Sequence, residues 1–152
     1  MSDIPTSGPH SALDEVMQFF ELVFSGSPSD PPERITEINA LIQGALANGY
    51  EYNGKAGTAD DLVKFRDFLL ASYPTMVFRV QNAITAPISM ASGAPVTTGV
   101  AISWRVDGTD KTGAQWYLEG MNLVSVVNGK AVTNNQLGDA GHGWQRVAGL
   151  RA

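Results

Sequence analysis

The apolar residues change their spacing once along the chain, and this change most constrains the fold. From residue 11 to residue 73 they recur every three or four positions, which is typical of amphipathic helices. From residue 76 to residue 137 they alternate with polar residues, as in strands with one buried face, and "NGK" at 128–130 is typical of a hairpin turn. Because the helices precede the strands, the sequence predicts an α+β domain, in which three N-terminal helices pack on one side of a curved antiparallel sheet.

Proline, threonine and glycine mark the ends of these elements. Pro32 suits the first position of the second helix, and Thr58 suits the N-cap of the third, which must end before Pro74. Gly49 is a plausible left-handed cap for the second helix, and Gly99 a plausible bulge in a strand. We therefore expect short connections and well-defined helix ends.

The length of 152 residues suits one domain with a sizeable core. We expect residues 1–10 to form a flexible tail, residues 11–140 a single α+β domain, and residues 141–152 a C-terminal tail or pocket lid. The polar start "MSDIPTSGPH" lacks the apolar stretch of a signal peptide, and no apolar run reaches the length of a membrane span. These features favour a cytoplasmic location and no membrane partner.

Charge and side-chain chemistry exclude several kinds of site. The formal net charge of −5 makes nucleic acid an improbable partner, because binding it requires positive charge. The chain contains no cysteine and only two histidines, so a metal site has little support, and we expect no cofactor. No phosphate loop, serine nucleophile elbow or dinucleotide fingerprint is present.

The stretch "ISWRVDGT" at 102–109 contains an unusual pair of charges. Alternation puts Arg105 and Asp107 on one face of the predicted strand, and Ile102, Trp104 and Val106 on the other. The pair has two interpretations: it is a solvated surface pair, or it lies inside a cavity. The pattern alone favours the surface pair.

Three segments carry a resemblance to a known family. They are "GTADDLVKFRDFLLASYPTMVFRV", "VAISWRVDGT" and "EGMNLVSVVNGKAVTNNQLGD". In this order they resemble the third helix and the long strands of the SnoaL-like polyketide cyclases, which belong to the nuclear-transport-factor-2-like superfamily. The resemblance covers roughly residues 11–140. It implies a cone-shaped fold whose curved sheet and helices enclose a deep, mostly apolar pocket.

The resemblance also implies catalytic residues. It places Arg105 and Asp107 in the pocket, where Asp107 would move or orient a proton and Arg105 would hold an oxygen. The "RVD" triplet is also similar to limonene epoxide hydrolases, in which a second aspartate lies on the last strand. The matching position here holds Gln136, which cannot take a proton. This departure counts against both mechanisms in their usual form, and leaves Gln136 as a hydrogen-bonding group.

Five further residues are candidates for binding substrate. Asn122 would reach a substrate carbonyl from the inner face, and Tyr50 and Tyr52 would border the cavity. Trp116 would form a wall, and His142 lies in a glycine-rich segment that would close over the mouth. Each also has a structural interpretation: a satisfied buried amide, core aromatic packing, or a solvent-exposed tail residue.

The resemblance implies a cofactor-independent cyclase or isomerase acting on a hydrophobic, polyketide-like small molecule in secondary metabolism, such as antibiotic biosynthesis. The pocket would fold the substrate, with acid–base or hydrogen-bond assistance. Epoxide opening is one alternative, and a non-catalytic ligand-binding or dimerising module is another. By analogy with the fold, we expect a homodimer formed through the outer face of the sheet.

Overall fold

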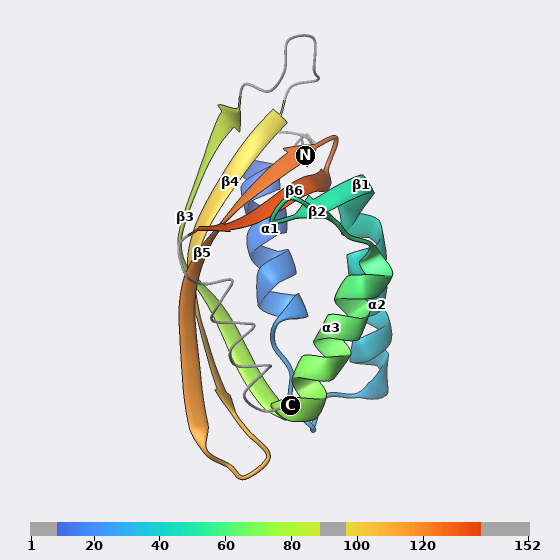
Figure 1. Ribbon diagram of the computed structural model, residues 1–152, viewed down its shortest axis with the longest axis vertical. Helices are drawn as coiled ribbons and strands as arrows, with labels where there is room; N and C mark the ends of the chain where they lie inside the picture. Colours follow the sequence, from blue (N-terminus) through green and yellow to red (C-terminus); the bar gives the residue numbers. More distant parts are fainter. Residues whose placement is uncertain (1–8, 89–96, 138–152) are drawn as a thin grey trace, which may run out of the picture.

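A computed structural model describes residues 9–88 and 97–137 of the chain (Figure 1). The three expected helices precede a series of long strands, and two short strands lie between the second and third helices. The elements are α1 (Pro9–Val23), α2 (Pro32–Ala45), β1 (Leu46–Tyr52), β2 (Lys55–Ala56), α3 (Ala59–Ser72), β3 (Thr75–Ile88), β4 (Thr97–Thr109), β5 (Gln115–Val127) and β6 (Lys130–Leu137). The predicted α+β architecture is confirmed.

The six strands form one open sheet in the order β2-β1-β6-β5-β4-β3. The strands β3 to β6 pair antiparallel, as expected, but β1 runs parallel to β6. The four predicted strands are therefore antiparallel, and β1 adds a parallel pair that the sequence did not predict. The strand β1 follows directly from α2 and joins the sheet edge from the helical side, so no hairpin forces it to run against its neighbour.

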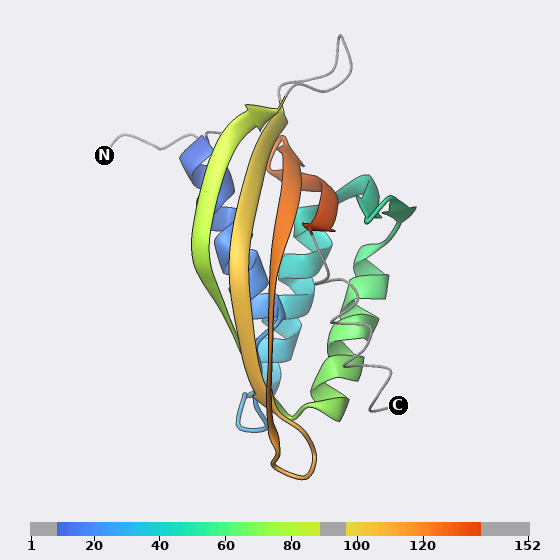
Figure 2. The ribbon, with the colours of Figure 1, turned by 60° about the vertical axis from the view of Figure 1, so that its left-hand side comes forward.

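All three helices lie on the concave side of the curved sheet, and α1 packs directly on β3 and β4 (Figures 1 and 2). The core follows this contact. Phe20 of α1 packs on Phe78 of β3 with ring centroids 5.7 Å apart, and Phe78 packs on Trp104 of β4 at 4.9 Å. Burying such aromatic side chains fixes α1 against the middle of the sheet.

The ends of the helices show why they begin and stop where they do. Thr58 and Asp61 form a capping box at the start of α3, which confirms the predicted N-cap. At the end of α1 the buried Arg66 donates hydrogen bonds from Nε to the carbonyl oxygen of Val23 (2.9 Å) and from Nη2 to that of Ser25 (3.2 Å). A cation at a helix C-terminus satisfies carbonyls that the helix itself leaves unpaired.

Two glycine predictions are wrong in position. The helix α2 ends at Ala45, and Gly49 takes its positive φ of 77° within β1, where the pairing with β6 shifts register. Gly99 pairs regularly with both neighbouring strands, and the irregularity of β3 and β4 lies between Val80 and Asn82. At position 49 glycine allows the positive φ. At position 99 glycine leaves room for a neighbouring side chain, since a Cβ on Gly99 would lie 2.3 Å from Ile88 Cδ1.

Candidate active site

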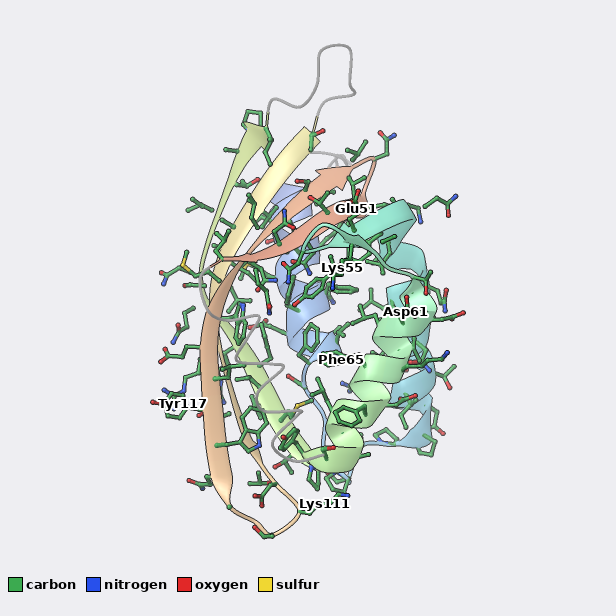
Figure 3. The ribbon with its side chains drawn as sticks, in the orientation of Figure 1. Glu51, Lys55, Asp61, Phe65, Lys111 and Tyr117 are labelled. Carbon is green, nitrogen blue, oxygen red and sulfur yellow. The ribbon has the colours of Figure 1, made fainter. Side chains whose placement is uncertain are left out.

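A central hollow of about 430 Å³ lies between the helices and the inner face of the sheet. Aromatic side chains of α1, α3, β3 and β4 line its apolar side, and Phe65 lies on the side of α3 that faces the sheet (Figure 3). Polar side chains enter from one end, where β1, β5 and β6 meet. They are Tyr50, Tyr52, Asn122, Asn134 and Gln136. The hollow therefore combines an apolar wall with a small set of hydrogen-bonding groups, as small-molecule sites do.

A chain of hydrogen bonds crosses the inner face of the sheet at this end. The Nε1 of Trp104 donates to Oδ1 of Asn122 over 2.7 Å, and Nδ2 of Asn122 donates to Oδ1 of Asn134 over 2.8 Å. All three side chains are buried. An indole N–H donates and never accepts, so Trp104 fixes the orientation of the Asn122 amide and, through it, that of Asn134.

The chain ends at Tyr50. Since the Oδ1 of Asn134 already accepts from Asn122, we assign its Nδ2 as the donor to the Tyr50 hydroxyl. The hydrogen bond with Asn134 lowers the pKa of Tyr50, as expected when the phenol oxygen accepts it. Burial has the larger effect and raises the pKa of Tyr50 above its ordinary value, so the phenol stays protonated at neutral pH. The proton of Tyr50 is thus available to a guest in the hollow.

Gln136 supplies the complementary group. Its position on β6 is directly opposite Asn122 on β5, and its backbone N–H donates to Oδ1 of Asn53 over 2.8 Å. Its side-chain Oε1 is buried and has no hydrogen-bond partner among the described residues. A buried acceptor without a partner is costly, and a guest hydroxyl would remove that cost.

Ionisable side chains stand at the rim of the hollow, where β2 meets the start of α3 (Figure 3). They are Tyr52, Lys55 and Asp61. Burial, with a smaller effect from the charge of Tyr50, raises the pKa of Tyr52 to about 12. One carboxylate oxygen of Asp61 accepts the backbone N–H of Thr58 over 3.0 Å. The rim therefore offers both a cation and an anion near the mouth.

Arg105 and Asp107 do not enter the hollow, and the expectation that they do is wrong. Their side chains lie on the outer face of β4, 38% and 43% exposed, and pair with each other over 3.0 Å. Arg105 also stacks on Tyr117 at 4.1 Å, on the side of the sheet away from the helices (Figure 3). Hydrogen bonds from Arg105 lower the pKa of Asp107, which keeps this surface carboxylate ionised and paired. The helices cover the apolar face of β4, and alternation leaves this pair outside.

The other candidates divide in the same way. Tyr50, Tyr52, Asn122 and Gln136 all line the central hollow, and their roles toward a substrate stay predictions. Trp116 faces inward but packs on Tyr73, with ring centroids 4.8 Å apart, and is not part of the wall. Its predicted role as a wall is therefore wrong. His142 lies outside the described residues.

Four residues of the site were not predicted from the sequence: Trp104, Asn134, Lys55 and Asp61. Alternation predicts Trp104 only as an apolar residue of β4, whereas its N–H orients the amide chain that ends at Asn134. Asn134 lies two residues before Gln136 on β6, so both side chains point to the same face of the sheet. This alternation could have predicted that Asn134 faces the hollow. Lys55 and Asp61 at the rim had no such signal, because a capping aspartate and a lysine beside a turn are ordinary surface residues.

Solved structures are similar to this chain throughout its length. A candidate SnoaL-like polyketide cyclase from Jannaschia sp. CCS1 matches 97% of each chain with a TM-score of 0.60 and 10% identity. The fold of this chain is similar to that of SnoaL-like and NTF2-like proteins. A SnoaL-like polyketide cyclase from Agrobacterium tumefaciens str. C58 matches 83% of this chain and 89% of its own, with a TM-score of 0.57 and 11% identity. An NTF2-like protein of unknown function from Burkholderia pseudomallei K96243 matches 90% and 96%, with a TM-score of 0.53 and 14% identity.

At these identities the likeness shows the fold and leaves the reaction to the site. No family model matches the sequence, and no curated protein matches it. Within residues 9–88 and 97–137, none of the helices has both the length and the apolar character that crossing a bilayer requires.

Proposed function

We propose that this protein is a cofactor-independent cyclase or isomerase acting on a hydrophobic, polyketide-like carbonyl compound. The observation that carries the proposal is the chain of hydrogen bonds from Trp104 through Asn122 to Asn134, which meets the buried Tyr50 hydroxyl at the wall of an apolar hollow. A Tyr50 oxygen that accepts from Asn134 keeps its proton for a guest. The SnoaL-like polyketide cyclases among the similar structures support the same reaction class.

The geometry suits ring closure within one molecule. Tyr50 donates a hydrogen bond to a carbonyl oxygen of the substrate, where negative charge grows as another part of the molecule adds to that carbonyl group. The acceptor Oε1 of Gln136 holds a hydroxyl of the same molecule. The apolar wall keeps the flexible chain folded, so that the reacting atoms stay close. A bond forms from the attacking atom to the carbonyl carbon, and the C=O π bond breaks. Tyr50 gives its proton to the former carbonyl oxygen and regains the proton that the attacking atom loses, so no atom is gained or lost.

The expected product is therefore an isomer of the substrate. We would incubate the protein with a panel of aryl diketones and hydroxy-ketones long enough to cyclise, and follow the products by mass spectrometry in water enriched in ¹⁸O. A product of unchanged mass with a new ring supports the proposal. A product that gains one labelled water indicates hydrolysis and would refute it, and binding without turnover would indicate a ligand-binding module.

Matched variants locate the reaction in the central hollow. Tyr50→Phe removes the donated proton, and we expect turnover to fall roughly ten- to a thousandfold, by analogy with single oxyanion donors. Tyr117→Phe removes the same hydroxyl from the outer face and serves as its control. Asp107→Asn should leave turnover unchanged, since Asp107 is outside the hollow. A strong loss in either control would place the chemistry elsewhere.

The outer face of the sheet supports a second proposal, that the protein forms a homodimer. Five large apolar side chains are exposed there: Val77, Ile84, Tyr117, Met121 and Leu137. The same face carries both charge signs, through Arg105 and Glu119. A second copy of the chain would cover these groups and pair opposite charges. Native mass spectrometry of the wild type and of Met121→Lys tests this: the variant should shift toward monomer, and a monomeric wild type would refute it.

A further inference from the structure

A second hollow of about 410 Å³ adjoins the central one, and we call it the lateral hollow. It lies between α1, α2 and the β5–β6 hairpin. Tyr50 and Asn134 line both hollows, as do Phe19 and Phe20, so these four side chains border both spaces. The phenol that ends the hydrogen-bond chain is therefore located where the two hollows meet.

The lateral hollow exists because its walls on α2 and β6 have little side chain. Ala40, Gly44 and Ala45 form the helical side, and Gly129 and Ala131 the strand side. Gly44 is informative because it lies in the last turn of α2, where alanine would favour the helix more than glycine does. A Cβ at Gly44 would meet nothing within 4 Å, and its backbone has no positive φ. Neither packing nor conformation requires this glycine, and its effect is to leave the wall open.

We propose that the two hollows are two lobes of one ligand site, and that the lateral hollow holds an uncharged apolar arm of the substrate. The proposal rests on the proposed function and names its substrate class: an elongated molecule with a carbonyl group between two apolar parts. The carbonyl oxygen accepts the Tyr50 proton at the junction. One part occupies the central hollow beside Gln136, and the other extends between α1 and α2.

The walls define the chemistry of the arm. Apart from Asn134, Tyr50 and Glu15, the side chains around the lateral hollow are apolar, among them Val16, Leu41 and Val124. Glu15 lies at the exposed edge of the lateral hollow, where partial burial raises the pKa of its carboxyl group. Each hollow alone is near the lower limit for a drug-sized ligand, and the two together suit a larger one. An alkyl chain or an aromatic ring fits these walls.

Binding of alkyl phenyl ketones tests the proposal. The series runs from acetophenone to octanophenone, so that the phenyl ketone stays constant and the arm grows by one methylene at a time. We would measure Kd by isothermal titration for the wild type, Gly44→Leu and Gly44→Ala. In the wild type, affinity should rise about fourfold per methylene until the lateral hollow is filled.

Leucine at position 44 should fill the lateral hollow. We expect Gly44→Leu to remove most of the gain in affinity that the wild type shows as the alkyl chain grows. The Kd of this variant for acetophenone should stay within about twofold of wild type. Gly44→Ala favours the helix without filling the space and should keep the gain. Ala40→Leu fills the same hollow from an exposed helical position, and supplies the test if leucine at 44 impairs folding.

The outcomes separate this proposal from the proposed function. The two-lobe site would be overturned if affinity rises equally with chain length in the wild type, Gly44→Leu and Ala40→Leu. This holds even if Tyr50→Phe weakens acetophenone binding. If Tyr50→Phe leaves acetophenone binding unchanged, this result refutes the role of Tyr50 and therefore the proposed function. Absence of binding by the whole series would overturn both.

Discussion

The direction of the hydrogen-bond chain gives a prediction that a single substitution tests. In Asn122→Asp, an ionised carboxylate still accepts from Trp104 but has no proton to donate to Asn134. Two oxygens would then face each other over the present 2.8 Å, and the Asn134 amide would turn to donate instead. Its oxygen would face Tyr50, whose proton would be donated to Asn134 and no longer to a guest. Asn122→Asp should therefore reverse the chain without removing any of its members.

The magnitude follows from the one hydrogen bond that the guest loses. A neutral hydrogen bond contributes about 0.5–1.5 kcal/mol net, so acetophenone should bind roughly two- to twelvefold more weakly to the variant. Tyr50→Phe removes the same bond and should weaken binding by a similar factor. Because both changes act on one proton, the double variant should lose no more than either single variant.

The effect should depend on pH in one direction. Below its pKa, the carboxyl group at position 122 carries a proton, donates it to Asn134 as the native amide does, and leaves Tyr50 free. Above that pKa the chain reverses. Affinity of Asn122→Asp for acetophenone should therefore be close to wild type at low pH and fall as the pH rises, while the wild-type Kd stays constant. Isothermal titration at several pH values measures both.

Two results would contradict this reasoning. The first is an affinity of Asn122→Asp equal to wild type across the whole range of pH, with cooperative unfolding retained. The second is full additivity of Asn122→Asp and Tyr50→Phe, which would mean that the two side chains act on the guest independently. Urea unfolding of each variant provides the check that the fold persists.

Three further predictions concern stability. Arg66→Met leaves the carbonyl of Val23 without its charged donor and should lower the free energy of unfolding by about 2–4 kcal/mol in urea titration; a loss below 1 kcal/mol would refute the capping role. Gly108→Ala places a Cβ 2.6 Å from the carbonyl oxygen of Thr75 and should cost about 1–3 kcal/mol by the same method, whereas an unchanged midpoint would show that β3 and β4 separate easily. The pKa of Tyr52 lies near 12 in the fold and near 10 in the unfolded chain, so the folded state retains its proton longer and stability should fall as pH rises from about 10 to 12. Tyr52→Phe should weaken that pH dependence in urea titrations, and an identical slope would contradict it.

Local chemistry made most of the elements predictable from the sequence. Thr58 with Asp61 caps a helix through contacts within four residues, and Asn128 and Gly129 adopt the positive φ values that a tight hairpin needs. Pro32 begins α2 as expected. Such features depend on neighbours in the chain, so they can be predicted without knowing the fold. Gly49 was different, because its positive φ serves the irregular pairing of β1 with β6.

The interior of the sheet shows where the pattern and the resemblance disagreed. Alternation placed Arg105 and Asp107 opposite Trp104, and the apolar residues of β4 had to face the helices. The resemblance predicted that the charged pair faces the pocket. In the structure the pair faces outward, as the alternation predicts. Asn122 and Gln136 share the parity of inward residues, and both reach the hollow.

The sequence by itself determined the elements, their order and which side chains share a face, because these depend on local backbone preferences and on the periods of helix and strand. Only the tertiary structure decided that Tyr50, from a strand that joins the sheet parallel to β6, meets Asn134 and completes the chain from Trp104. It alone decided that small residues on α2 and β6 leave a second hollow beside the first. Both results depend on contacts between segments far apart in the chain, and no local pattern records which distant surfaces will meet.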